Sequence, residues 1–518
     1  MALITESFLF NLLGILIALL AVAITFFKWR YNYWTRKGVP QMSPKIPFGN
    51  IGEALSQRKT LGEVGTDMYN WAKAKNLPHL GIYFLARPTY FPLDLEIVKD
   101  ILTTNFSHFV NHGGFVNEED DPLSGHLFNL EDTKWRNVRI KLTPTFTSGK
   151  MKMMFETMVK CSRELNTFVD SSANLPEGLD IKETVARFTT DIIGSVAFGI
   201  ECNTLKNPDT PFRKYGRLTL ENDLWQNLKL FATLVFPHNI LKFFHFKATR
   251  SDVESFFMDL VKRTVQYRES NNVYRKDFLQ LLMQLKNKGK ISDEDNEAMD
   301  GEKLEVKLNI NEVAAHSFVF FIAGFETSST TMTFALYELA KHQQIQEKLR
   351  DEINRVLKKH NGEYTYEAFM EMKYMDQVIN ETLRKYPPVP VLTRACTKDY
   401  QIPGTSATIE KDTLCFISTM GIQHDPEYYP DPAKSPPDRF SEENKDSIPQ
   451  YAWLPFGEGP RICIGLRFGV MQARVGLASI VRNHRVTLNK KTKEPLTFAK
   501  ESFIISPEGG VWLDCQKL

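Results

Sequence analysis

Residues 455–465 read PFGEGPRICIG and place one cysteine, Cys463, between two isoleucines in a glycine-rich turn. The chain has six cysteines, and none of the others falls within this stretch, so Cys463 lacks a CxxC partner. Apolar residues then recur at spacings of three and four up to Ile480, which predicts a helix that begins near the cysteine. A thiol at a helix start with Arg461 nearby is expected to have a lowered pKa, so this pattern predicts a thiolate.

The residues around Cys463 suit a metal ligand. Gly459 and Gly465 are expected to let backbone N–H groups approach the sulfur, and Phe456 is expected to shield it from water. A shielded thiolate with N–H donors aimed at it is what a soft iron ligand requires. An inert buried cysteine is the alternative for an isolated thiol, and the Phe-x-x-Gly-x-Arg-x-Cys-x-Gly spacing weighs against it.

This spacing resembles the haem-ligand signature of the cytochromes P-450 and matches it at every fixed position. The resemblance extends over residues 30–518 and implies a mainly α fold with a smaller β region, the cytochrome P-450 fold, preceded by an N-terminal transmembrane helix. It implies a bound haem (iron protoporphyrin IX), with Cys463 as the metal ligand and Phe456 and Arg461 as further haem contacts. The implied reaction inserts one oxygen atom from O2 into a lipophilic small molecule.

A second segment, 314–342, predicts a long helix at the centre of the fold. Asn309 and Glu312 have the spacing of a capping box, so a helix of about 33 residues is expected to start there. Residues 318–323 are apolar on all sides of this helix, which predicts that it is buried on every face.

Gly324, Glu326 and Thr327 interrupt this apolar helix, and a buried acid and alcohol need partners or a purpose. One interpretation is structural, with the Thr327 hydroxyl bonded to the carbonyl four residues earlier. The other follows from the resemblance, because residues 323–328 match the oxygen-activation motif of the family. It implies that Glu326 and Thr327 are catalytic, that Thr327 holds the iron-bound peroxide, that Glu326 takes part in relaying protons from solvent, and that Gly324 opens a kink for O2.

Two further sets of residues match family positions. Trp135 and Arg139 are four apart on a predicted helix, 131–142, and therefore share one face. By resemblance these two residues, Arg394 and Arg461 bind the haem propionates, for which arginine has a suitable geometry.

Glu381 and Arg384 are three apart on a predicted helix, and by resemblance they join Arg439 in a buried triad. We expect this triad to be a structural lock beneath the Cys463 loop and not a catalytic group.

The resemblance places the substrate pocket against segments 109–128, 318–323 and 389–392 and the region near Phe503. Apolar side chains there favour a lipophilic substrate, although each is equally consistent with a place in the core: Phe115, Val116, Phe128, Phe320, Val391 and Phe503.

Residues 8–27 carry no charge and would span about 30 Å as a helix, the thickness of a bilayer core. A cleaved signal peptide is the alternative, but its apolar core would be only about 7–15 residues long. The basic residues directly after the span predict a cytosolic catalytic domain: Lys28, Arg30, Arg36 and Lys37. We expect a transmembrane signal anchor and flank at 1–29, a Pro-rich hinge at 30–50 and one haem-thiolate catalytic domain at 51–518, on the endoplasmic reticulum membrane.

Two other segments have distinctive compositions. Residues 228–250 are apolar with interspersed basic residues, which is consistent with a buried hairpin or with a second, shallow membrane contact. Residues 287–307 are dense in charge and predict an exposed, mobile connection.

The net charge of +2 gives no reason to expect a nucleic-acid partner, and the unpaired cysteines fit a reducing compartment. The sequence contains no dinucleotide-binding fingerprint, so NADPH would act only indirectly. The implied electron donor is an NADPH-cytochrome P-450 reductase, with cytochrome b5 as a further candidate partner. The predicted docking patch on the helix at 131–142 consists of Lys134, Arg136 and Lys141.

In style the sequence is most similar to insect microsomal members that oxidise plant toxins and insecticides, and an endogenous lipid or hormone remains open as substrate. An isomerase or dehydratase of the same fold and a non-enzymatic haem-binding membrane protein are the alternatives. The acid–threonine pair at 326–327 favours the monooxygenase.

Overall fold

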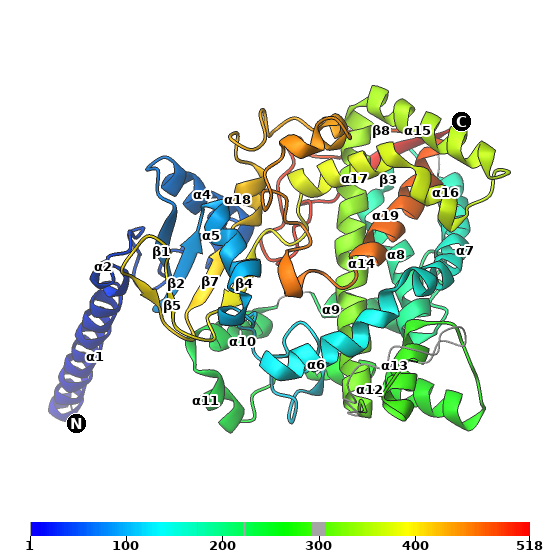
Figure 1. Cartoon of the computed structure of the whole chain (residues 1–518). Helices are drawn as coiled ribbons and strands as arrows, with labels where there is room; N and C mark the ends of the chain where they lie inside the picture. The colour runs from blue at the N-terminus through cyan, green and yellow to red at the C-terminus, as the bar shows by residue number, and fades with distance from the viewer. Residues whose placement is uncertain (1, 173–174, 221–222, 292–306) are drawn as a thin grey trace.

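The computed structural model describes residues 2–172, 175–220, 223–291 and 307–518. A helical mass forms the larger part of the body, and a smaller sheet region lies at its left in Figure 1, where helix α1 projects outward. The predicted fold class, mainly α with a smaller β region, is confirmed.

The helices are, in chain order, α1 (Ala2–Arg30), α2 (Tyr33–Arg36), α3 (Gly52–Leu55), α4 (Leu61–Lys73), α5 (Leu95–Lys99), α6 (Asp132–Leu142), α7 (Ser148–Ser172), α8 (Ile181–Ile193), α9 (Pro211–Leu218), α10 (Leu224–Val235), α11 (His238–Phe243), α12 (Ser251–Ser270), α13 (Phe278–Lys288), α14 (Ile310–Lys341), α15 (Gln343–Lys359), α16 (Tyr366–Glu371), α17 (Lys373–Lys385), α18 (Thr419–Gln423) and α19 (Leu466–Val481).

The strands are β1 (His79–Phe84), β2 (Arg87–Pro92), β3 (Leu179–Asp180), β4 (Leu392–Ala395), β5 (Tyr400–Gln401), β6 (Thr408–Ile409), β7 (Leu414–Ile417), β8 (His484–Leu488) and β9 (Trp512–Lys517). A mixed sheet has the order β1-β2-β7-β4, in which only β2 and β7 are parallel. A second sheet has the order β3-β9-β8, and β5 pairs with β6.

Helix α14 runs through the helical mass and packs against α8 and α19 (Figure 1). Its predicted capping box is confirmed, because the Asn309 side chain accepts a hydrogen bond from the Glu312 amide and the Glu312 carboxylate accepts one from the Asn309 amide. Helix α14 is continuous through Gly324, the residue at which the family resemblance implies a kink. A Cβ at Gly324 would lie 2.6 Å from Ile193 Cδ1, so this glycine also lets α14 pack closely on α8.

The sequence has short runs of β-favouring residues at 79–93, 412–418 and 502–514, and the first two form the β1–β2 hairpin and β7. In the third run, strand β9 starts only at Trp512, after a turn at Glu508 and Gly509. Two consecutive glycines with positive φ, Gly509 and Gly510, explain this difference, because they reverse the chain before β9.

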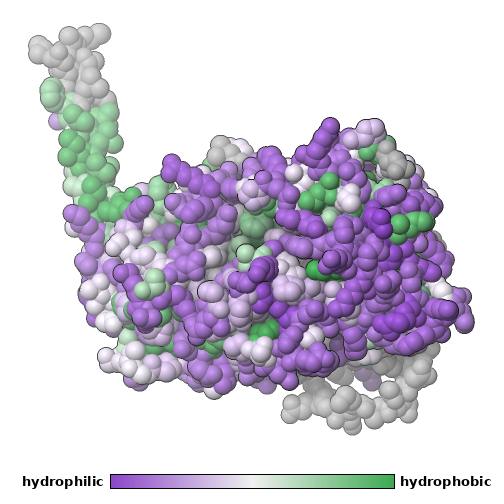
Figure 2. All heavy atoms as spheres, turned by 90° about the horizontal axis from the view of Figure 1, so that it is seen from above, coloured by the Kyte–Doolittle hydropathy of each residue, from purple (hydrophilic) through white to green (hydrophobic). Residues whose placement is uncertain are grey.

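Among the described residues, one helical stretch, Phe10–Arg36, is long and apolar enough to cross a bilayer, by length and composition. Figure 2 shows the apolar surface of α1 standing out from a largely hydrophilic body. A helix with these properties fits a transmembrane anchor.

The segment after α1 is docked on the sheet. Trp34 is fully buried and donates its indole N–H to the Ile82 carbonyl at 3.1 Å. Its ring occupies the place that a Cβ of Gly81 would take. The expected hinge region at 30–50 therefore packs against β1 as α1 leaves the body.

Helices α10 and α11 lie at the lower edge of the body in Figure 1, below the sheet. The buried-hairpin interpretation of residues 228–250 is wrong, because most of the apolar side chains of these helices are exposed. They are Trp225, Leu228, Leu230, Phe231, Val235, Phe236, Ile240, Phe243 and Phe244. The prediction of an exposed connection at 287–307 falls mostly on 292–306, which lie outside the described residues.

Candidate active site

A cavity of about 300 Å³ lies between α14, α6, the start of α19 and the residues around β4. Its walls are mostly apolar, from residues such as Leu127, Phe146 and Val319. The cavity brings together seven residues predicted from the sequence: Trp135, Arg139, Thr327, Arg394, Phe456, Arg461 and Cys463. Glu326, the eighth predicted site residue, is not part of its wall.

Cys463 presents its thiol to the cavity from the turn just before α19. Its backbone N–H donates to the Phe456 carbonyl at 2.9 Å, which closes the turn. The surrounding protein raises the pKa of the Cys463 thiol by desolvation, and the Gly465 N–H and the Arg139 charge lower it by less. The expected lowered pKa is wrong for the chain without a metal, because burial outweighs the nearby donors.

The two glycines of the turn have different roles. The Gly465 N–H lowers the pKa of the Cys463 thiol, and a Cβ on Gly465 would meet no atom within 4 Å. Gly459 has a positive φ of 74°, and a Cβ there would collide with the Leu102 carbonyl. Gly459 therefore lets the Cys463 loop pack against residues 100–104.

Three guanidinium groups, those of Arg139, Arg394 and Arg461, also line the cavity. Arg394 is fully buried, and its Nε has no hydrogen-bond partner in the part of the chain that the structure describes. Burial lowers the pKa of Arg394 to about 10. Burial, followed by the charges of Arg394 and Arg139, lowers the pKa of Arg461 to about 9. The charges of Arg394 and Arg139 act on Arg461, so three cations lie near one another and form a site for an anion.

Arg461 also holds the loop that precedes α6. It donates to the carbonyls of Val110 and Leu130 at 2.8 and 2.7 Å, and its guanidinium lies 4.0 Å from the centre of the Trp135 ring. Because most of its donors are used in this way, Arg461 fixes the wall of the cavity in addition to lining it.

The donor set fits haem. No carboxylate is present among the described residues that line the cavity, so the cationic side lacks an anion from the chain. The unpartnered guanidinium N–H suits a carboxylate of haem, and the apolar walls suit its flat apolar body. The single thiol suits its iron. The residues that would hold it are Trp135, Arg139, Arg394, Phe456, Arg461 and Cys463.

Thr327 and Glu326 point in different directions from α14. The Thr327 hydroxyl faces the cavity and donates to the Ala323 carbonyl at 2.5 Å, which is the structural interaction considered from the sequence. The Glu326 carboxylate turns toward α8, where Oε1 lies 2.5 Å from Lys182 Nζ. Lys182 also donates to the hydroxyls of Ser329 and Thr330.

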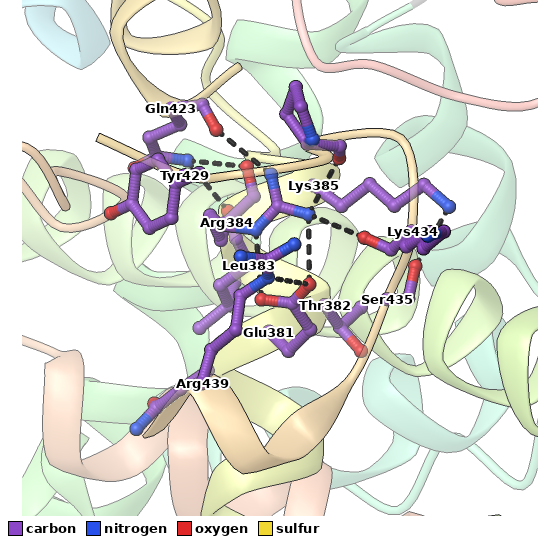
Figure 3. A network of polar contacts seen from close by, with 12 residues as sticks. Glu381, Thr382, Leu383, Arg384, Lys385, Gln423, Tyr429, Lys434, Ser435 and Arg439 are labelled. Carbon is purple, nitrogen blue, oxygen red and sulfur yellow. Dashed lines mark hydrogen bonds and ion pairs between the residues drawn. The ribbon is translucent and has the colours of Figure 1, made fainter. Parts of the chain in front are cut away.

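The triad of Glu381, Arg384 and Arg439 is formed as expected (Figure 3). Arg384 is fully buried and makes two hydrogen bonds of 2.8 Å to the Glu381 carboxylate. It also donates to the Gln423 carbonyl, and the Gln423 side chain accepts a hydrogen bond from the Leu454 amide at 2.8 Å. The triad is thereby connected to the chain that leads into the Cys463 turn, which is the arrangement of a structural lock.

The predicted substrate contacts are correct in part. Phe128 and Phe320 line the cavity. Phe115, Val116, Val391 and Phe503 do not. Val391 is buried in the core beside the sheet, Phe115 packs on His238 and Phe246, and Phe503 is exposed.

Two histidines that the sequence analysis did not select line the same cavity. His112 lies 3.2 Å from Arg394 Nη1 and stacks on Phe128, and His316 lies on α14. A single histidine without a spacing motif carries no signal in the sequence, so only the three-dimensional arrangement reveals these two.

Comparisons with known proteins agree over nearly the whole chain. The family model described as "Cytochrome P450" matches residues 41–513. "Probable cytochrome P450 6a23" from Drosophila melanogaster is 43% identical over 511 residues, which cover 98% of this chain and 99% of the relative. "Cytochrome P450 6A1" from Musca domestica is 42% identical over 516 residues, 99% of this chain and 98% of the relative. "Cytochrome P450 6k1" from Blattella germanica is 39% identical over 517 residues, again 99% and 98%.

Proposed function

The chain belongs to the cytochrome P-450 family of haem-dependent monooxygenases, and we propose that it oxidises lipophilic small molecules of foreign origin, such as plant toxins or insecticides. The observation that carries this proposal is the mostly apolar cavity that also contains the thiol of Cys463. An apolar cavity of this kind selects ligands by shape and hydrophobicity, which suits varied lipophilic compounds. The similarity to insect relatives supports the same substrate class.

When bound, haem supplies the activation of O2. The role of the chain is to hold it, exclude water and move protons. Thr327 is the hydroxyl on the α14 wall of the cavity, and Glu326 is the adjacent acid. We propose that Glu326 passes protons from the Lys182 side of α14 to the Thr327 hydroxyl, from which they reach the cavity.

The proposed location is the endoplasmic reticulum membrane, with α1 as the anchor and the catalytic body in the cytosol. The proposed division is an anchor and flank at 1–29, a connecting segment at 30–50 and a catalytic domain at 51–518. The exposed apolar side chains of α10 and α11 support a second contact with the same membrane. In Figure 1 both α1 and α11 lie toward the lower left of the molecule.

The proposed electron donor is an NADPH-cytochrome P-450 reductase, with cytochrome b5 as a second candidate. The proposed docking surface is the outer face of α6, where Arg136 is exposed and Lys134 pairs with Glu118 at 2.5 Å. Lys141, the third basic residue of this predicted patch, lies at the end of the same helix.

The test starts with the carbon monoxide difference spectrum of the reduced full-length protein. A thiolate ligand predicts a red-shifted Soret band, and Cys463→Ser is expected to abolish it. Cys161→Ser is the matched control, because Cys161 lies on α7 away from the cavity and the band should remain. A band typical of histidine ligation would contradict the assignment.

The reaction itself is tested by turnover with the reductase and a panel of plant toxins and insecticides. The proposal requires products that contain one oxygen atom from O2 and a dependence on NADPH. Conversion of a peroxide substrate in the absence of NADPH would support the isomerase or dehydratase instead. No conversion of any panel member, with thiolate ligation intact, would exclude this substrate class.

A further inference from the structure

His316 is a polar residue in an otherwise apolar part of the cavity wall. It is almost completely buried, and both of its ring nitrogens lack a hydrogen-bond partner among the described residues. No other described histidine has two buried nitrogens without partners. Leaving a buried donor and acceptor without partners destabilises the fold, so such a group usually has a function.

A comparison with another buried histidine shows that this is not the rule in this chain. His484 is also fully buried, and its ring nitrogens contact the Asp170 carboxylate at 2.8 Å and the Ile480 carbonyl at 3.2 Å. His484 is therefore satisfied inside the protein, whereas the structure provides nothing equivalent for His316.

The position of His316 on α14 directs it into the cavity. Val319, Ala323 and Thr327 follow it at spacings of three and four, which place all four residues on one stripe of the helix, and all four line the cavity. His316 precedes Thr327 by eleven residues, which corresponds to about 16 Å along the helix axis. The cavity thus has the proton-delivering hydroxyl near one end of this stripe and an unpartnered imidazole at the other.

The surroundings keep this imidazole uncharged. Burial, and next the nearby His126 and Lys134, lower the pKa of His316 to about 3. A neutral imidazole has one N–H donor and one acceptor nitrogen, which suits a hydroxyl or carbonyl oxygen and not a carboxylate.

We propose that His316 is a specificity-determining residue that hydrogen-bonds a hydroxyl or carbonyl oxygen of the substrate. On the premise of the proposed monooxygenase function, the preferred substrates are elongated lipophilic molecules. They carry one neutral polar oxygen at the end remote from the oxidised carbon. Val319 and Ala323, which follow His316 on the stripe, are apolar, so this hydrogen bond sets the direction in which the molecule lies along α14.

The test measures ligand binding to the haem-loaded full-length protein through the ligand-induced shift of the Soret absorbance. The probes are n-alkan-1-ols of increasing length and the n-alkanes of the same lengths. Each pair differs by one hydroxyl group, and the ratio of the two dissociation constants measures what the hydroxyl contributes. In the wild-type protein this ratio should favour the alcohol once the chain is long enough to reach from the Thr327 end of the stripe to His316.

His316→Leu should reduce the alcohol preference roughly 2- to 10-fold, the size of one hydrogen bond, with little loss of alkane affinity. His316→Gln should retain most of the preference, because an amide also offers a donor and an acceptor. Val319→Leu is the matched control on the same stripe, and it should change both members of a pair by the same factor.

Equal ratios in the wild-type, His316→Leu and His316→Gln proteins would overturn the role of His316. If these proteins still bind the ligands with a Soret shift, the proposed function is not affected by that result. If His316→Leu folds poorly, the proposal is still tested by the Gln variant and by the wild-type protein. An alcohol preference of the wild-type protein that never rises with chain length contradicts the proposal. Absence of a thiolate-type carbon monoxide band in the wild-type protein would instead refute the proposed function.

Discussion

The Thr327 hydroxyl has one proton, and in the structure that proton is donated to the Ala323 carbonyl. What the side chain presents to the cavity is therefore an acceptor oxygen, and it must rotate to donate. Hydroxyls of the same helix that have no access to the cavity make the same type of bond, as Thr333 does with Ser329 at 2.7 Å. The bond to the carbonyl four residues earlier is therefore a general habit of hydroxyls on this helix, and it neither requires nor excludes a function of Thr327 in the cavity.

Thr327→Ala is expected to leave haem content and ligand binding intact, because the hydroxyl bonds to a carbonyl of its own helix, Ala323, and does not connect α14 to another element of the cavity wall in the described chain. NADPH consumption should continue, while product per NADPH falls by roughly tenfold or more and hydrogen peroxide is released, since proton delivery is impaired. Coupling is measured by NADPH oxidation, product and peroxide in the same reaction.

Thr333→Ala is the control for this substitution, because Thr333 is buried in α14 outside the cavity. It should leave the coupling unchanged. If Thr327→Ala lowers NADPH consumption and product in equal proportion, Thr327 controls binding or reduction. Unchanged coupling would assign Thr327 a structural role only.

Single residues differ in how far the sequence reveals them. Cys463 is marked by five fixed positions, and Arg394 is identified only through the family resemblance. The raised pKa of the Cys463 thiol was not predicted, because a helix start and an arginine are visible in the sequence but the burial that outweighs them is not. His316 was missed because its distinguishing property, two buried nitrogens without partners, exists only in three dimensions.

At the scale of the secondary-structure elements, the contact between α17 and the Cys463 loop depends on Arg384. Its planar guanidinium makes five hydrogen bonds, two to Glu381 and one each to the carbonyls of Gln423, Pro432 and Lys434. An ammonium group has only three donors. Arg384→Lys is therefore expected to destabilise the haem-loaded protein by about 3–5 kcal/mol and to reduce its haem content. The carbon monoxide band, measured per mole of protein during urea unfolding, reports both effects.

The exposed pair of Lys348 and Asp438, 3.2 Å apart, is the control for this prediction. Lys348→Ala should change neither stability nor haem content measurably, because exposed ion pairs contribute little. An Arg384→Lys protein with full haem content and wild-type stability would contradict the lock.

The Lys182–Glu326 pair connects α8 to α14, and both side chains are largely buried. Lys182→Met leaves the Glu326 carboxylate buried without its cation. It should therefore lower the free energy of unfolding more than Lys182→Met combined with Glu326→Gln does. The expected coupling free energy is about 1–3 kcal/mol in a double-mutant cycle of urea unfolding. Additive effects of the two substitutions would show that the pair does not hold the helices together.

Elements with a local signal were predicted well. The helices at 132–142 and 310–341 follow from periodicity and, for the second, from the capping box. Strand β4, Leu392–Ala395, was missed because it has four residues and its partner β7 is about twenty residues away. Alternation over so few positions does not distinguish a strand from a loop, so only the long-range pairing defines it.

At the scale of the whole molecule, two apolar surfaces, α1 and the α10–α11 region, are available to a bilayer. Deleting residues 1–27 should release the protein from membranes only in part, with haem retained. Phe243→Ser together with Phe244→Ser in the truncated protein should lower the bound fraction at least about tenfold, because two aromatic side chains no longer insert. Sedimentation with liposomes of microsomal lipid measures the bound fraction.

Met370→Ser in the same truncated protein is the control. Met370 is also exposed but lies on α16, which is at the right of the body in Figure 1, away from α10 and α11. It should leave the bound fraction unchanged. Complete release on removal of residues 1–27 alone would show that α10 and α11 do not contact the membrane.

The hollow between α14 and α19 has a consequence for the lifetime of the protein in a cell. Protein interiors are close-packed, and a void of about 300 Å³ in the middle of a core forfeits contacts on all its walls. Haem would supply those contacts and the counter-charge for Arg139, Arg394 and Arg461, so its capture would complete the folding of the chain. A cell that runs short of haem would then degrade the newly made polypeptide. The amount of active enzyme would follow the iron and porphyrin supply of the cell even while the messenger RNA is abundant.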